Sequence, residues 1–382
     1  MKQNCRAIRL IFLAFGLAIS AWAPLVPLVK SNLQLDDAEL GLVLFVLGFG
    51  ALITMPLTGW LINQVGSRSI TFISGLGVLT VLPLLTLAPS TLTLCIFLFL
   101  FGVVTGAMNV SMNAQSVDIE IACKTPILSG VHCWFSIGGL LGASIVSGLI
   151  ALQLPLYCCT LAISGIILLI LCTQCNRLLE FDPTTKNINE VNAGSFTMTN
   201  PQVLILGALC FIAFMAEGSM LDWSAEYLRS NLNYDTSTAG IGFALFSVAM
   251  AFGRFIGDRA IRKFGPIEVF QWGCLIAASG FLIVVNASWG YFELLGFCLI
   301  GVGASNSVPI LFGCSGKLSN ISSNNALTII TTCGYIGLLF GPAVLGLIAQ
   351  ATTLSFALAI IAVFLIGIGM CARAALPATS TS

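Results

Sequence analysis

The chain alternates between long apolar runs and short polar segments. Helices need about 17 to 25 apolar residues to cross roughly 30 Å of hydrocarbon. Continuous apolar runs favour helices over the alternating strands of a β-barrel. Twelve such runs are predicted to span a bilayer, at residues 10–29, 39–62, 70–88, 92–112, 127–150, 155–172, 203–221, 238–257, 267–286, 291–313, 326–350 and 354–372.

Composition agrees with a membrane protein. Charged residues are 8% of the 382 positions and hydrophobic residues 58%, with a mean hydropathy of +1.02. A soluble domain carries about 25% charged residues. The first run follows Arg6 and Arg9 and contains Ala21, which also fits a cleaved signal peptide, but the run is long enough to span. We therefore expect an all-α, multi-pass membrane protein.

The basic residues set the expected orientation. With the N-terminus inside, 13 of the 15 Lys and Arg residues fall on the cytoplasmic side, and only Lys30 and Arg229 fall outside. This asymmetry is the positive-inside pattern, so both termini are predicted to be cytoplasmic. The net charge is zero and the basic residues form no continuous patch, which argues against nucleic-acid binding.

One long polar interval divides the chain into halves. Residues 174–200 have no helical apolar period and are predicted to be a cytoplasmic linker between bundles of six helices each, 1–173 and 201–382. The halves share short matches in the same order, at offsets of 197 to 199: 11–15 with 210–214, 106–109 with 303–306, and 138–142 with 337–341. Because each half has an even number of spans, the two bundles should be parallel repeats.

Polar groups are concentrated in particular runs. The third, sixth, ninth and twelfth runs have no charge in their interiors, whereas the fourth, fifth, seventh and tenth hold asparagine, histidine or glutamate. Polar side chains at membrane depth usually face a bundle interior or a wet cavity. The pattern predicts a central pathway that four outer helices shield from lipid.

Two cytoplasmic turns carry a related motif. The turn after the second run reads Gly59-Trp-Leu-Ile-Asn63-Gln-Val-Gly66-Ser-Arg68, and the turn after the eighth reads Gly253-Arg254-Phe-Ile-Gly257-Asp258-Arg259. Both resemble the loop signature of the major facilitator superfamily, Gly-x-x-x-Asp-Arg/Lys-x-Gly-Arg/Lys. The stretches 109–115, 132–139, 217–224 and 334–342 resemble the branch of that superfamily that contains bacterial YbjJ-type inner-membrane proteins.

The resemblance implies a secondary transporter of the bacterial inner membrane whose two bundles rock about a midplane site. It also implies a cytoplasmic gate, for which the candidates are Gly59, Asn63, Gly66, Arg68, Arg254, Asp258 and Arg259. Asn63 stands where the family usually has aspartate, so the first-half motif is expected to lack its carboxylate. The alternative is that these charges only set topology.

Several polar residues could line a solute cavity. Asn109 and Asn113 share one face of the fourth run with Gly102 and Gly106, and Asn306 is the repeat partner of Asn109. Such a face offers amide donors and acceptors, but small residues and amides also serve helix packing. Tyr335 carries the same two alternatives, and Trp223 is predicted to close the outer end of the cavity.

Two titratable groups are candidates for carrying a coupling proton or binding a cation, His132 and Glu217. His132 could relay protons near neutral pH, or could be a neutral residue bonded to a neighbour. Glu217 lies about 21 Å along its helix, where an ionised carboxylate costs several kcal/mol. The sequence suggests no basic partner at that depth, so Glu217 is expected to exchange protons or to stay protonated against a neighbouring helix. Asp222, Glu226 and Arg229 are predicted to form a solvated cluster near the outer surface.

Enzymatic signatures are missing from the sequence, which contains no nucleotide-binding loop and no zinc-ligand spacing, so we expect no enzyme activity, cofactor or metal. The leading interpretation is a monomeric, proton-coupled transporter of a small polar organic solute, either sugar-like or an acid metabolite. The alternatives are an exporter of amphipathic toxic compounds and a membrane receptor or scaffold that does not transport.

Overall fold

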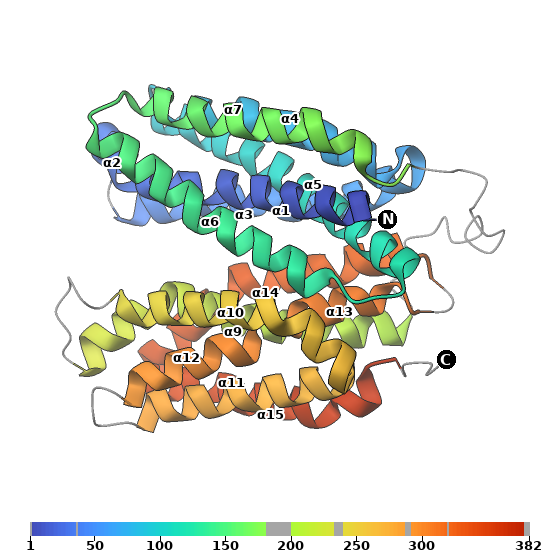
Figure 1. Cartoon of the computed structure of the whole chain (residues 1–382). Coiled ribbons are helices and arrows are strands. Elements are labelled where there is room, and N and C mark those ends of the chain that lie inside the picture. The colour runs from blue at the N-terminus through green and yellow to red at the C-terminus, as the bar shows by residue number, and fades with distance from the viewer. Residues whose placement is uncertain are drawn as a thin grey trace. The chain divides into compact units, whose positions relative to one another are not determined.

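The described structure is helical throughout. The computed structural model describes residues 2–35, 37–180, 200–232, 240–286, 292–318 and 321–377, and these contain helices and turns but no strand (Figure 1). Twelve helical segments in this part of the chain are long and apolar enough to cross a membrane. The predicted all-α fold class with twelve transmembrane helices is confirmed.

The first half contains α1 (Lys2–Trp22), a 3-10 turn (Ala23–Leu25), α2 (Val26–Leu33), α3 (Asp37–Val65), α4 (Ser67–Leu85), α5 (Thr91–Cys123), α6 (Leu128–Ala151), α7 (Leu156–Gln174) and a second 3-10 turn (Cys175–Arg177). The second half contains α9 (Pro201–Leu232), α10 (Ile241–Phe264), α11 (Pro266–Asn286), α12 (Phe292–Ala304), α13 (Ser307–Ser315), α14 (Ser323–Ala351) and α15 (Leu354–Ala375). Most of the predicted linker, residues 181–199, lies outside the described residues.

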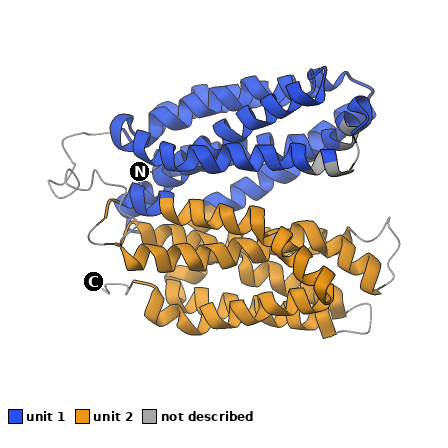
Figure 2. Ribbon diagram, turned by 180° about the vertical axis from the view of Figure 1, so that it is seen from behind, with its two compact units in different colours: residues 1–124, 131–194, 323–328 blue, residues 125–130, 195–322, 329–382 orange. Residues whose placement is uncertain are grey.

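The helices form two compact units, coloured separately in Figure 2. Unit 1 comprises residues 1–124, 131–194 and 323–328, and unit 2 comprises residues 125–130, 195–322 and 329–382. Two helices change unit near their N-termini. The start of α6 belongs to unit 2 and the rest of α6 to unit 1, whereas the start of α14 belongs to unit 1 and the rest to unit 2.

Glycines bring the first and fifth helices of each half into close contact. In unit 1, a methyl group on Gly138 of α6 would collide with the backbone oxygen of Leu13 in α1. In unit 2, a methyl group on Gly337 of α14 would collide with the backbone oxygen of Phe211 in α9. Small residues permit such backbone approach between membrane helices. The matched glycines of the two halves therefore perform the same packing task.

Packing also explains part of the glycine and asparagine face on α5. A methyl group at Gly102 would collide with the backbone oxygen of Leu47, and one at Gly106 would lie 2.8 Å from the Cα of Ala51, both on α3. These two glycines serve the contact between α3 and α5. The cavity hypothesis for this face therefore depends on its two asparagines.

The predicted span 291–313 is a broken helix. α12 ends at Ala304 and α13 begins at Ser307. Pro309 explains the break, because proline has no N–H to donate to the carbonyl four residues earlier, which is that of Ser305. The uninterrupted hydrophobicity of this run predicts a continuous helix and gives no sign of the break. The break leaves the Ser305 carbonyl without its helical hydrogen-bond donor inside a predicted membrane span.

Candidate functional site

An ion pair lies inside unit 2, between α9 and α10. Nη2 of Arg254 is 3.5 Å from Oε1 of Glu217. The Arg254 side chain is buried, with 7% of its surface exposed, while the Glu217 side chain is 27% exposed. Arg254 also donates from Nε to the Ser305 carbonyl at 3.4 Å. The guanidinium therefore contacts both the carboxylate and the carbonyl that the helix break releases.

The expectation that Glu217 has no basic partner is wrong. The charge pattern places Arg254 on the cytoplasmic side, but α10 continues to Phe264, so Arg254 lies roughly three turns before the helix ends. Both residues fall within candidate membrane spans. Opposite charges in contact each reduce the free energy of burying the other. The basic residues Arg262 and Lys263, in the last turn of α10, were the sequence signal that this helix extends further.

Aromatic rings lie near the ion pair. Phe214, less than one turn before Glu217 on α9, has its ring centroid 5.8 Å from that of Tyr335 and 6.4 Å from that of Phe312. Tyr335, a predicted cavity residue, therefore packs against the same turn of α9 that carries Glu217.

Asn306 joins the helix break to α10. Its Nδ2 donates to the Gly253 carbonyl at 3.2 Å and to Oγ of Ser305 at 2.8 Å. Its Oδ1 accepts a hydrogen bond from Oγ of Ser129, in the short part of α6 that belongs to unit 2. A methyl group at Gly257 would collide with the Asn306 amide. The Asn306 side chain therefore uses both Nδ2 and Oδ1 in hydrogen bonds that hold the helix break against α10 and the start of α6.

Asp258 contacts the N-terminus of α6, also within unit 2. Its Oδ2 accepts a hydrogen bond of 3.0 Å from the backbone N–H of Gly130, in the first turn of α6. Helix N-termini carry unpaired N–H groups and a partial positive charge, so a carboxylate is stabilising there. Arg262 donates to the Pro126 carbonyl at 3.5 Å. Arg259 is exposed, with its guanidinium 5.8 Å from the centroid of the Phe255 ring.

Asn63 makes the corresponding contact in unit 1. Its Nδ2 donates to Oδ1 of Asn325 at 2.7 Å, and its Oδ1 accepts from Nδ2 of Asn324 at 3.3 Å. Asn63 lies near the end of α3 and contacts the start of α14, and Asp258 lies in the last two turns of α10 and contacts the start of α6. The missing carboxylate at position 63 is thus replaced by amide hydrogen bonds.

The other gate candidates of unit 1 have structural roles. Gly59 packs against Thr328, whose side chain a methyl group at position 59 would strike. Gly66 begins the turn into α4 with φ +81° and ψ 151°, a conformation that only glycine adopts readily. Arg68 follows in the first turn of α4 and is ion-paired with Glu180, a partner that the sequence did not suggest.

The remaining predicted residues are distributed over both units. In unit 1, Asn113 is buried and donates within its own helix to the backbone oxygen of Asn109 at 2.9 Å and to its Oδ1 at 3.2 Å. The His132 ring meets Phe12 edge to face at a centroid distance of 5.1 Å. In unit 2, Trp223 packs against Gly346 of α14. None of these contacts tests a cavity or proton-carrying role, which stays a prediction.

Of the predicted charge cluster of Asp222, Glu226 and Arg229, the structure pairs Glu226 with Arg229 near the C-terminal end of α9. Nη2 of Arg229 is 2.9 Å from Oε2 of Glu226, and both side chains are exposed. Tyr227, by contrast, is buried and donates from its hydroxyl to the Val284 carbonyl of α11 at 3.1 Å. It therefore packs the helices of unit 2 together.

Comparison with known proteins places the chain among transporters. The sequence profile of the Major Facilitator Superfamily matches residues 10–227 and 205–382. An uncharacterised MFS-type transporter of Yersinia pestis is 40% identical over 368 residues, covering 96% of this chain and 94% of that protein.

Solved structures show the same fold. FucP, the fucose:proton symporter of E. coli, in its outward conformation aligns with a TM-score of 0.83 at 17% identity, over 98% of this chain and 99% of FucP. The proton:xylose symporter XylE aligns with a TM-score of 0.77 at 16% identity, over 98% of this chain and 95% of XylE. From the profile match over both halves, supported by the Yersinia relative, the chain belongs to the Major Facilitator Superfamily of membrane transporters.

Proposed function

We propose that this chain is a proton-coupled secondary transporter that moves a small polar organic solute by alternating access across the bacterial inner membrane. The ion pair between Glu217 and Arg254 is the observation that carries the proposal. Charged residues within membrane spans are rare and commonly mark transport or proton pathways. The partly exposed carboxylate gives protons a route to a charge that is otherwise enclosed.

Proton binding would change the contacts of Arg254. Protonation neutralises the Glu217 carboxylate and removes its attraction for the guanidinium, which at 3.5 Å is about 5 kcal/mol for an effective dielectric constant of 20, before desolvation is subtracted. Arg254 from α10 contacts this carboxylate, and Phe214, three residues before Glu217 on α9, packs against Tyr335 of α14. Loss of the ion pair would free α9 and α10 to adopt a second arrangement, as alternating access requires.

Charge favours an acid over a sugar as the solute. Protonating Glu217 raises the charge of the buried site by one. A solute with one negative charge that arrives with the proton leaves the site charge unchanged, whereas a neutral sugar leaves the extra charge in place. Uncompensated charge inside a protein costs several kcal/mol. XylE and FucP, by their names, couple sugars to protons, so both solute classes belong in the test.

Asp258 and Asn63 are proposed to act at the cytoplasmic gate. Each contacts a segment at the start of a helix that continues into the other unit, α6 for Asp258 and α14 for Asn63. Movement of one unit against the other would have to strain or break such contacts. We therefore assign them the role of holding one conformational state.

The experiment begins with a thermal-shift screen of sugars and carboxylic acids on the purified protein, since a ligand stabilises the state that it binds. Hits are then tested in proteoliposomes with and without an imposed proton gradient. The proposal expects accumulation above equilibrium that a protonophore abolishes, and for an acid carried with one proton, no response to membrane potential. Gradient-independent equilibration would contradict proton coupling, and transport confined to amphipathic drugs would favour the exporter.

A further inference from the structure

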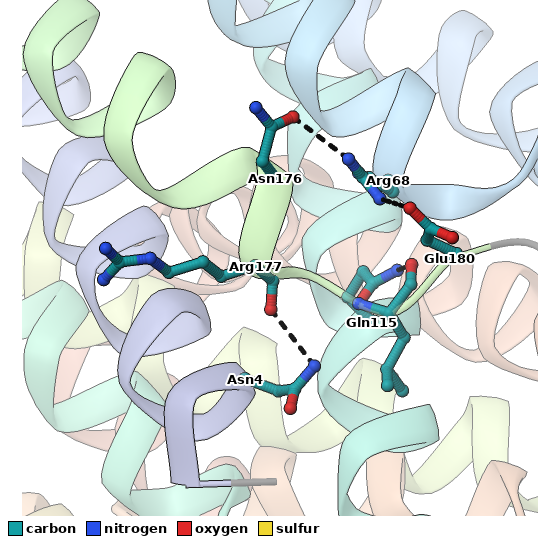
Figure 3. Close-up of polar contacts among 7 residues, drawn as sticks. Asn4, Arg68, Gln115, Asn176, Arg177 and Glu180 are labelled. Carbon is teal, nitrogen blue, oxygen red and sulfur yellow. Dashed lines mark hydrogen bonds and ion pairs between the residues drawn. The ribbon is translucent and has the colours of Figure 1, made fainter.

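The segment that follows α7 is bound to the end of unit 1. We call residues 175–180 the strap; it begins with the 3-10 turn Cys175–Arg177. The side chains of Cys175 and Leu178 are buried, and the Arg177 carbonyl accepts a hydrogen bond of 3.1 Å from Nδ2 of Asn4 in α1. Figure 3 shows the strap crossing from α1 toward α4 and α5. The polar stretch after the sixth span therefore begins as an ordered part of unit 1.

A buried glutamine recognises the strap backbone. Gln115, on α5, donates from Nε2 to the Leu179 carbonyl at 2.9 Å and accepts at Oε1 from the Leu179 N–H at 3.1 Å. The same Nε2 donates to Oγ of Ser67 at 2.9 Å. Gln115 is 2% exposed, so water cannot readily replace these bonds. One amide thus connects the strap to the first residue of α4.

The strap also supplies the partners of Arg68, the residue next to Ser67. Nη1 of Arg68 is 2.5 Å from Oε1 of Glu180, and Nη2 donates to Oδ1 of Asn176 at 3.0 Å (Figure 3). Arg68 belongs to the turn motif in which Asn63 replaces a carboxylate. Glu180 places a carboxylate beside that motif from a distant point in the sequence.

We propose that Glu180 and Gln115 are positioning residues of the cytoplasmic gate: Gln115 holds the strap so that Glu180 reaches Arg68, and Glu180 fixes the Arg68 guanidinium at the end of the turn motif. The inference rests on the proposed transport function. It assigns the strap a role in turnover, with no role in solute binding. Both residues act through Arg68 and touch no solute.

The first arm of the test measures docking of the strap without any solute. Hydrogen exchange at the Leu179 amide is followed in the purified full-length protein, in the native form and in Gln115→Leu. Loss of a buried acceptor should accelerate exchange at Leu179 about tenfold or more, while amides in the middle of α7 keep their native rates. Unchanged exchange at Leu179 would overturn the role of Gln115.

The second arm measures transport in proteoliposomes by Glu180→Gln, Arg68→Glu and the charge-swapped pair Arg68→Glu with Glu180→Arg. Exposed ion pairs are weak, so Glu180→Gln should lower the maximal rate about two- to fivefold, with an unchanged half-saturating solute concentration. The charge-swapped pair should recover at least half of the transport rate that Arg68→Glu alone loses. Glu226→Gln is the matched control, because it removes the exposed pair with Arg229 without touching the strap.

The outcomes separate the two proposals. Native rates in Glu180→Gln, or no recovery in the swapped pair, would overturn the positioning role of Glu180. Absence of transport in the native protein would instead contradict the proposed function, and the exchange arm would still decide whether Gln115 docks the strap. A higher half-saturating concentration with an unchanged maximal rate would mean that the strap affects solute binding and would also overturn the inference.

Discussion

Replacing Gly257 by alanine should destabilise unit 2 through the packing of Asn306. The added methyl group would collide with Oδ1 of Asn306 and would lie 2.7 Å from the Ser129 side chain. The amide can escape only by rotating. Rotation would break its hydrogen bonds to Ser129, the Gly253 carbonyl and Ser305.

The magnitude follows from these contacts. Each hydrogen bond contributes about 0.5 to 1.5 kcal/mol, so losing all three costs roughly 1.5 to 4.5 kcal/mol. Alanine in place of glycine inside a helix returns about 1 kcal/mol. The net change in unfolding free energy for Gly257→Ala should therefore be a loss of about 0.5 to 3.5 kcal/mol.

The assay is thermal unfolding of the purified protein in one detergent, compared with Gly165→Ala. Gly165 lies inside α7, and a methyl group there would meet nothing within 4 Å. We expect a lower midpoint for Gly257→Ala and an unchanged or higher midpoint for Gly165→Ala. Equal midpoints for the two variants would refute the assigned packing around Asn306.

Three further predictions follow from single contacts. Asp258→Asn removes the negative charge at the N-terminus of α6, worth about 1 kcal/mol, so transport should fall about fivefold with membrane insertion unchanged; a native rate would exclude the gate role. Gly66→Ala should lower the thermal midpoint, because its backbone conformation costs about 1 to 3 kcal/mol for other residues; a midpoint equal to that of Gly165→Ala would exclude strain. Tyr227→Phe should destabilise by about 1 kcal/mol, because the Val284 carbonyl lies in the last turn of α11 and loses a donor; unchanged stability would mean water replaces the hydroxyl.

The fold was largely predictable from the sequence, because each membrane helix can be recognised from its own residues as a continuous apolar run. The break between α12 and α13 was missed because hydrophobicity continues through it. Its signal was Pro309, whose missing N–H leaves the Ser305 carbonyl without its helical partner.

The site was less predictable, because its contacts join residues far apart in the chain. Glu217 was identified from its depth, but its partner Arg254 is 37 positions away on another helix. Glu180 lies 112 positions from Arg68, in a polar stretch with no apolar period. Such pairs depend on how separate helices pack and on where their side chains point, and residue spacing along one helix predicts neither.

The central claim is that Glu217 carries the coupling proton and that, when deprotonated, it forms the ion pair with Arg254. The most direct measurement is proton-gradient-driven solute accumulation by Glu217→Gln in proteoliposomes, with Asp222→Asn, an exposed carboxylate on the same helix, as the control. Glutamine resembles the protonated acid, so the variant should lose uphill accumulation but still exchange solute without a gradient, while the control accumulates normally. Full gradient-driven accumulation by Glu217→Gln would contradict the claim.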